Sequence, residues 1–179
     1  MRPDETSSLP ARGTSGAPPD AWIAPNATVL GDVTLGEGCS IWYGCVVRGD
    51  TDKISIGAQT NIQDLTMVHV DEGVPCTIGA RVGVGHRAII HGCTIEDECL
   101  IGMGAVILNR AVIGTGSVVA AGAVVPEGMI VPPGSLVMGV PGRVVRQVDA
   151  ALRARITGTW KHYVEQAELH RAGKYKKVT

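Results

Sequence analysis

Two histidines lie five residues apart in the apolar stretch VGVGHRAIIHGC, at His86 and His91. Imidazole is the commonest side-chain ligand of transition metals, and it also serves as a general acid or base. No single helix or strand brings both rings together. Helical ligand pairs are three or four residues apart, and residues five apart on a strand face opposite sides. Any chemistry that involves both histidines therefore depends on the architecture around them.

The composition favours a narrow aliphatic core. The 179 residues include 24 glycines and no phenylalanine, and aromatic residues make up only 3% although 45% of the chain is hydrophobic. This length fits one domain with a sizeable core. The formal net charge of −1, without a basic patch, argues against a nucleic-acid partner. No apolar run is long enough for a membrane span, so we expect no membrane partner.

The first 20 residues, MRPDETSSLPARGTSGAPPD, lack the apolar segment of a signal peptide and predict a flexible tail over 1–20. The five cysteines form no CxxC pair. Cys39, Cys45 and Cys99 fall on an inward-facing position of the repeat described next. Buried, reduced thiols are typical of a cytoplasmic protein, and the cytoplasm is the predicted location.

An aliphatic residue recurs every six residues through most of the chain. This period fits neither a helix nor a simple alternating strand, and it is the signature of a parallel β-helix in which three hexapeptides form one triangular coil. A glycine commonly follows the aliphatic residue and is expected to help turn the corners. The sequence predicts an all-β domain of hexapeptide repeats over 21–146. The repeat positions are Ile23, Val29, Leu35, Ile41, Val47, Ile56, Ile62, Val68, Ile78, Val84, Ile90, Ile95, Ile101, Ile107, Ile113, Val119, Val125, Val131 and Val137.

The remaining segment, 147–179, has a different period. Apolar residues recur there every three or four positions, which predicts an amphipathic α-helix over 147–171 with its apolar stripe against an outer face of the β-helix. Gly158 is a potential kink. His162 and His170 lie on this helix and are interpreted as ordinary helix residues rather than ligands. The stripe consists of Val148, Leu152, Ile156, Trp160, Tyr163 and Ala167.

Interruptions of the repeat assign the histidines to columns. Three extra residues follow Val47 and four follow Val68, and we interpret both insertions as corner loops. Val47, Val68 and Ile90 then fall on the same face of successive coils. The residues that directly follow them stack in a column, separated by the strand spacing of about 4.8 Å. A second column on a neighbouring face holds Asp64 and His86. The first column is predicted to contain Arg48, His69 and His91, bounded by Leu30 and Leu108.

Within one chain His86 therefore points away from the other two histidines. Rotational symmetry can join the columns, because a closed trimer would place His69 and His91 of one chain opposite His86 of the next. Three neutral imidazoles with an open fourth position form a catalytic zinc site. The alternative is that each histidine is an ordinary surface residue. It is disfavoured by the shared register and by the polar neighbours Arg48, Gln63 and Asp64.

The segments IWYGCVVRGD, TNIQD, VHV and GHRAIIHGC resemble those of the γ-class carbonic anhydrases, a family of the hexapeptide-repeat, left-handed β-helix superfamily. The resemblance implies a left-handed parallel β-helix followed by a C-terminal α-helix, and a homotrimer with zinc, or iron or cobalt, at each interface. His69, His86 and His91 match the metal ligands. Arg48 and Asp64 match a pair that joins subunits beside the metal.

Further matches concern the reaction. Asn61 and Gln63 match residues that orient water or bicarbonate, Asp50 matches the acid of the RGD segment, and Tyr163 matches a helix tyrosine near the site. The implied activity is reversible hydration of CO2 to bicarbonate by a zinc-bound hydroxide. Zinc supplies this hydroxide because it lowers the pKa of its bound water to about 7 in carbonic anhydrases.

The sequence departs from that pattern in the loop over 70–77, which is short and offers only Asp71 and Glu72 as proton relays. Thr51 also stands where archaeal-type members have an acid. Two alternatives therefore stay open. One is a carbonic-anhydrase-like metal protein with little anhydrase activity, whose role is that of a scaffold, a thioesterase-like enzyme or a siderophore-related protein. The other is a hexapeptide acyltransferase, which would need an acyl-CoA groove and one general-base histidine.

Overall fold

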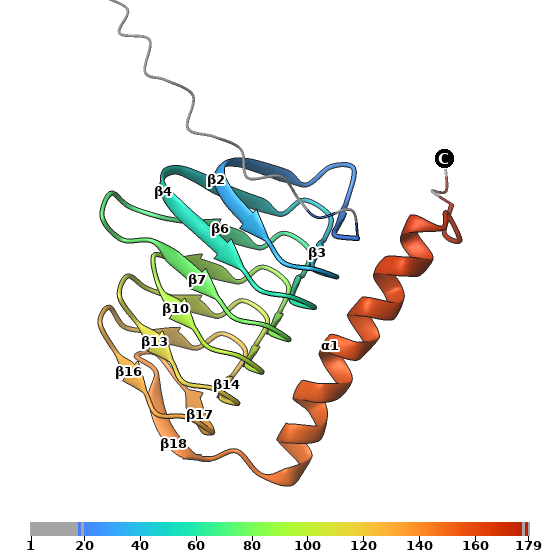
Figure 1. The fold of residues 1–179 in the computed structure, drawn as a ribbon. Helices are drawn as coiled ribbons and strands as arrows, with labels where there is room; N and C mark the ends of the chain where they lie inside the picture. Colours follow the sequence, from blue (N-terminus) through green and yellow to red (C-terminus); the bar gives the residue numbers. More distant parts are fainter. Residues whose placement is uncertain (1–17, 19, 177, 179) are drawn as a thin grey trace, which may run out of the picture.

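A computed structural model describes residues 18, 20–176 and 178, so the predicted tail over 1–20 lies almost wholly outside the described residues. The chain winds into stacked coils of short strands, and one long helix lies along the stack (Figure 1). The strands are β1 Trp22–Ile23, β2 Thr28–Leu35, β3 Ser40–Ile41, β4 Val46–Ile56, β5 Asn61–Ile62, β6 Met67–His69, β7 Cys76–Ile78, β8 Gly83–Val84, β9 Ile89–His91, β10 Thr94–Ile95, β11 Leu100–Ile101, β12 Val106–Ile107, β13 Val112–Ile113, β14 Val118–Val119, β15 Val124–Val125, β16 Ile130–Val131, β17 Ser135–Met138 and β18 Arg143–Gln147.

Strands β1–β17 stack in parallel in two hydrogen-bonded sheets, and β18 joins the first sheet antiparallel to β17. One sheet has the order β1-β3-β5-β8-β11-β14-β17-β18, and the other has the order β15-β12-β9-β6-β4-β7-β10-β13-β16, with β2 paired to β4. Strand β4 is 11 residues long and pairs with β6 through its first half and with β7 through its second half. It therefore runs through a corner and joins two faces of a three-sided coil. The predicted parallel β-helix is confirmed.

The repeat positions fill the interior of this prism. Ile41, Ile62 and Ile101 are fully buried, and most of the other repeat residues are buried with them. Full burial of such a side chain contributes roughly 1.5–3 kcal/mol, so the stack of aliphatic residues is the main source of stability. All five cysteines are free and buried, as the repeat predicts for three of them.

The glycines that follow the aliphatic residues have a different role from the one expected. Gly85 and Gly102 have no positive φ, and a Cβ on them would lie 2.7 Å from the Met103 nitrogen and 2.3 Å from the Ala121 nitrogen of the next coil. These positions therefore require glycine because successive coils approach closely. The corner itself is turned two residues later, at positions such as Arg87 (φ 59°) and Gly104 (φ 67°).

Helix α1 spans Ala150–Arg171 and begins three residues later than the periodicity predicts. The reason is that 143–147 forms β18, which pairs antiparallel with β17. Asp149 then caps the helix, since its Oδ1 accepts a hydrogen bond of 2.9 Å from the Leu152 nitrogen. The helix continues unbroken through Gly158.

Helix α1 covers the sheet that contains β1, β3, β5 and β8, as the apolar stripe predicts (Figure 1). Near its start, Val148 and Ile156 pack in a cluster with Leu100, Val118 and Leu136. Near its end, the His170 ring lies 5.1 Å from the rings of both Trp22 and Trp42. Among the described residues, no helix combines the length and apolar character needed to cross a bilayer.

Candidate metal centre

The strand register confirms the first predicted column. Arg48 is the register partner of Leu30 on one side and of His69 on the other, and His69 is in turn the partner of His91. The side chains therefore project from the same face of successive coils. Leu108 follows Ile107, the partner of Ile90, and so ends the column.

The rings of His69 and His91 face each other across this column. Their closest atoms, Nδ1 of His69 and Nε2 of His91, are 3.1 Å apart. Two nitrogens bound to one tetrahedral zinc ion at 2.0–2.1 Å lie about 3.3–3.4 Å apart. The pair is therefore already close to the spacing that two ligands of one ion require.

The opposite nitrogen of each ring contacts a hydrogen-bond acceptor. His69 Nε2 lies 3.2 Å from Asp50 Oδ1, and His91 Nδ1 lies 2.6 Å from Asn109 Oδ1. The orientation of the Asn109 amide is fixed because its Nδ2 donates to Asp71 Oδ2 at 2.8 Å. In the tautomer that places the proton of each neutral ring on this outer nitrogen, both facing nitrogens would present lone pairs. In that tautomer the two lone pairs could bind one cation, and in the other tautomer one ring donates a hydrogen bond to the other.

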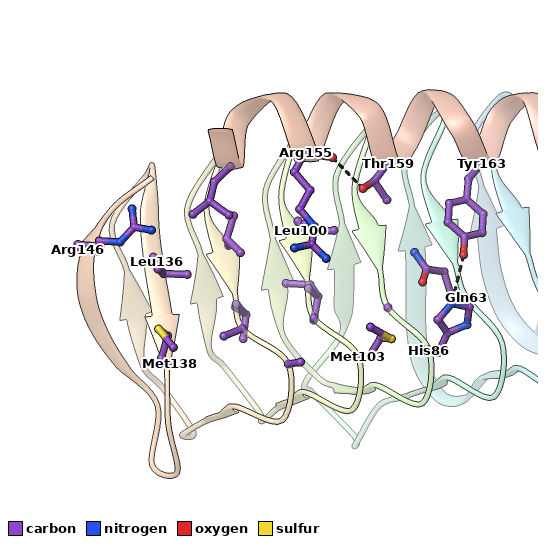
Figure 2. A pocket seen from close by; sticks show the side chains of 18 residues that line it. Gln63, His86, Leu100, Met103, Leu136, Met138, Arg146, Arg155, Thr159 and Tyr163 are labelled. Atoms are coloured by element: carbon purple, nitrogen blue, oxygen red, sulfur yellow. Dashed lines mark hydrogen bonds between the residues drawn. The ribbon is translucent and has the colours of Figure 1, made fainter. Parts of the chain in front are cut away.

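His86 lies on another corner of the coil with the same type of support. Its Nδ1 is 2.9 Å from Asp64 Oδ2, which confirms that these two residues are neighbours on successive coils. A carboxylate on one ring nitrogen directs the lone pair of the other nitrogen outward, as in many metal-binding histidines. Figure 2 shows Tyr163 reaching from α1 toward His86, with its hydroxyl 3.4 Å from His86 Nε2.

The charged groups around the column are paired within the chain. Arg48 Nη1 donates to Asp50 Oδ2. This bond, together with the contact to His69, holds the pKa of Asp50 at about 2, so this carboxylate stays ionised and accepts from His69 at neutral pH. Arg48 and Asp64 form no ion pair with each other within the described residues of one chain.

Two amides lie beside His86 on β5 and at its end. Gln63 and Asn61 are both buried, and Gln63 Nε2 donates to Asn61 Oδ1 at 3.0 Å. Asn61 in turn donates to the Val82 carbonyl at 3.4 Å. These contacts fix the Gln63 amide at the edge of a cavity that His86 and Tyr163 also line.

The hydroxyl of Tyr163 is a neutral donor over the physiological range. Burial, with a smaller contribution from the negative charge of Asp64, raises the pKa of Tyr163 to about 12. The Trp42 ring packs edge-on against the Tyr163 ring at 5.0 Å between centroids. Helix packing therefore determines where this hydroxyl lies relative to His86.

Sequence reasoning missed Asn109 as a partner of His91. Asn109 directly follows Leu108, so extending the column by one coil and one residue would have identified it. Asp71 does lie near His91, with Oδ1 at 4.0 Å from Nε2, but its second oxygen is held by Asn109. Glu72 is exposed, and no described contact links it to the histidines.

The described residues of a single chain bring no three metal-ligating side chains together. His69 and His91 form a two-ligand half-site, and His86 with Asp64 forms a separate one-ligand half-site. The two groups could complete one site only if a second chain brought them together.

Comparison with known proteins assigns this architecture first to a broad class. The family described as bacterial transferase hexapeptide (six repeats) matches residues 19–49 and 92–127. A solved hexapeptide transferase family protein from Anaplasma phagocytophilum is 39% identical, covers 85% of this chain and 90% of its own, and superposes with a TM-score of 0.82. An N-acyltransferase from Bacillus cereus, AntD, is 18% identical with a TM-score of 0.67 and so shows a shared fold alone.

Sequence relatives are more specific. A Methanocaldococcus jannaschii protein named "Probable carbonic anhydrase" is 55% identical over 146 residues, which is 82% of this chain and 92% of that protein. A carbonic anhydrase of Geobacillus kaustophilus is 43% identical over 85% of this chain and 84% of its own. The chain belongs to the γ-class carbonic anhydrase family. It spans 56% of the length of the mitochondrial γ carbonic anhydrase 2 of Arabidopsis thaliana, to which it is 42% identical over 84% of this chain.

Proposed function

We propose that the protein is a metal-dependent carbonic anhydrase, a lyase that hydrates CO2 reversibly to bicarbonate in a homotrimer. The observation that carries this proposal is the pair of facing imidazole nitrogens at 3.1 Å on the column that Arg48 begins. Family membership supports the same reaction.

In the proposed trimer, His69 and His91 of one chain and His86 of its neighbour hold the ion. Zinc is the first candidate because three neutral imidazoles suit it, and iron(II) or cobalt(II) suits the same donors. A bound zinc ion supplies hydroxide at neutral pH by lowering the pKa of its water. Asp50, Asn109 and Asp64 keep the three rings in the ligating tautomer.

The remaining polar groups bind and orient the small reactants. The protonated hydroxyl of Tyr163 can donate to an oxygen beside His86, and the fixed amide of Gln63 can bind the oxygens of bicarbonate. Asn61 acts through Gln63 and is a positioning residue. Arg48 and Asp64 would meet across the interface and connect the two half-sites.

The exit of the proton is the weakest part of the site. Asp71 and Glu72 are the acids of the short loop, and Asp71 is engaged by Asn109. We expect turnover to be limited by proton transfer, so added imidazole buffer should raise the rate. The buried thiols are compatible with the proposed cytoplasmic location.

Subunit complementation tests the shared site. The variants His86→Ala and His91→Ala should each bind no zinc alone. When they are co-expressed at equal levels, mixed trimers contain one interface that joins the intact halves, and about a quarter of the wild-type zinc should return. Zinc would be measured by elemental analysis of purified trimers. Absence of zinc from verified mixed trimers would exclude a site built from two chains.

Stopped-flow CO2 hydration tests the activity. The fully metallated trimer should be measured with zinc and, under anaerobic conditions, with iron, over a range of buffer concentrations. A rate that rises with both metal loading and buffer supports an anhydrase with a weak proton relay. A trimer that holds metal but is inactive in every buffer would instead favour the metal-containing scaffold.

A further inference from the structure

A cavity of about 520 Å³ lies between α1 and the sheet that contains β5, β8 and β11 (Figure 2). One end is lined by Gln63, His86 and Tyr163, and the other reaches Leu136 and Arg146 near the last coil. Cavities of this volume typically bind small organic molecules. CO2 and bicarbonate are far smaller, so the proposed reaction leaves most of this cavity without a role.

The walls of the cavity are mainly aliphatic. Leu100, Val118 and Leu136 project from the sheet, and Leu152 projects from α1. Met103 lies at the corner on the open side, one coil from His86, and is 55% exposed in the single chain. A hydrocarbon chain in this space would exclude water from surface that is now only partly covered.

The charged side chains that line the cavity are cationic. Arg146 and Arg155 both line it, and no aspartate or glutamate does. Arg146 is paired with Asp149 at 2.9 Å. Among the described residues, no acidic side chain forms an ion pair with Arg155. Figure 2 shows the Arg155 side chain extending from α1 into the space over Leu100.

Arg155 also breaks the pattern of its helix face. Leu152, Arg155, Thr159 and Tyr163 are spaced by three or four residues and line the cavity together. A helix face that only packs on its own sheet is apolar. Arg155 is exposed, so its guanidinium lies on the solvent side of this face, where an anion bound in the cavity could reach it.

We propose that this cavity binds a small aliphatic carboxylate, with its carboxylate paired to Arg155 and its hydrocarbon tail along Leu100, Met103 and Val118. The guanidinium fork can donate two parallel hydrogen bonds to a carboxylate, which gives selectivity over neutral or cationic molecules with the same tail. The site goes beyond the proposed carbonic anhydrase function and requires no metal ion.

Calorimetric titration of the full-length protein with butyrate, hexanoate and octanoate tests this site directly. Affinity should rise about three- to fourfold for each added methylene that enters the cavity. Octan-1-ol and octylamine carry the same tail without the negative charge and should bind at least about tenfold more weakly than octanoate. The titrations should be repeated with metal-free protein, where the affinity should be unchanged.

Two variants locate the binding. Arg155→Gln should weaken octanoate binding about tenfold or more but leave octan-1-ol unaffected. Ala120→Leu adds a side chain to the cavity wall and should weaken both ligands. Lys161→Gln removes an exposed charge elsewhere on α1 and serves as the matched control, with no change expected. Circular dichroism and light scattering confirm that each variant folds and assembles like the parent.

Several outcomes would overturn the proposal. Octanoate affinity that is lost without metal would assign the carboxylate to the ion, and affinity that survives Arg155→Gln unchanged would exclude Arg155 as its partner. Failure of the assembled protein to bind octanoate at millimolar concentration would show that the cavity is not a carboxylate site in the assembly. Neither result bears on CO2 hydration, which is measured separately, so the two proposals can fail independently.

Discussion

Each of the three histidines is held by a neighbour on its outer nitrogen. Asp50, Asn109 and Asp64 supply one acceptor apiece, and each lies on a different coil or corner from the histidine that it contacts. In metal sites, such outer contacts set the tautomer and the ring orientation, and their loss commonly weakens metal binding 10- to 100-fold. The ligating ability of the rings therefore depends on the side chains around them.

The role of Asn109 can be tested by substitution. Asn109→Ala should weaken zinc binding roughly 10- to 100-fold, because His91 loses the acceptor that fixes its tautomer. Asn109→Asp retains an acceptor at Oδ1 and should recover most of the affinity. Zinc dissociation constants from chelator competition decide the matter. Glu72→Gln, on the same loop as Asp71, is the control that should leave the affinity unchanged.

Tyr163 should influence the reaction without holding the ion. Because its pKa is raised to about 12, the hydroxyl keeps its proton through the neutral range, and no activity change from its ionisation is expected below about pH 10. Tyr163→Phe should lower kcat for CO2 hydration by roughly 10-fold or more while the zinc content stays full. Loss of zinc from this variant, or full activity, would contradict the assigned role.

For single residues, the sequence predicts the column of Arg48, His69 and His91 but not the side chains that hydrogen-bond to the histidine rings. The register of Arg48, His69 and His91 follows from counting hexapeptides, since backbone spacing determines it. The contact between His91 and Asn109 depends on side-chain rotamers, which periodicity does not contain. The loop that carries Asp71 also lies outside the repeat, so its approach to Asn109 could not be counted.

The C-terminal helix contacts the last coils of the stack near its start and the first coils near its end. It lies along one sheet, packs Ile156 under its first half and places Tyr163 beside His86 farther along. Its direction runs back along the stack, so the aromatic cluster at its end involves Trp22 and Trp42 of the first coils. Helix docking and site geometry are therefore coupled.

Truncation of the buried helix residue should reveal that coupling. Ile156→Ala should lower the free energy of unfolding by about 2–5 kcal/mol, because it removes a buried side chain and leaves a cavity. Denaturant titration of the assembled protein would measure this loss. Glu165→Ala, at an exposed position of the same helix, should change stability by no more than about 0.5 kcal/mol. Equal effects of the two changes would mean that the helix is not docked as described.

The elements differ in how well the sequence predicts them. The strands and the helix stripe follow from periods of six and of three to four, which extend over many residues despite the corner insertions. The segment over 143–147 carries no period, and its pairing with β17 depends on a chain reversal that the sequence pattern does not mark. The role of the repeated glycines was misassigned because a close approach between coils leaves no local signal.

For the molecule as a whole, the core is a single aliphatic column that also contains the thiols. Burial raises the pKa of Cys39 and of Cys99 from 9.0 to about 12, and that of Cys45 to about 11. A raised folded-state pKa means that ionisation favours the unfolded chain. The contribution of these buried thiols to the free energy of unfolding is therefore fully present below pH 9 and decreases as the pH rises toward 11–12.

Alkaline unfolding checks this dependence. Each of these thiols should cost on the order of 1 kcal/mol of stability per pH unit above 9. Urea titrations at pH 8, 9 and 10 would measure the trend, and the variants Cys39→Ala and Cys99→Ala should show a smaller slope. A flat profile in the parent protein would show that the thiols ionise as readily in the fold as in the open chain.

A stack of similar coils can in principle be extended at either end. Each coil exposes the same row of backbone groups that the next coil pairs with, so nothing in the repeat itself stops it from growing by recruiting strands of other molecules. In the first sheet, β18 reverses direction and covers the row presented by β17. Its antiparallel course ends the parallel pattern of this sheet. The short hairpin that periodicity did not predict therefore hinders parallel addition of another molecule's strand to the end of this sheet.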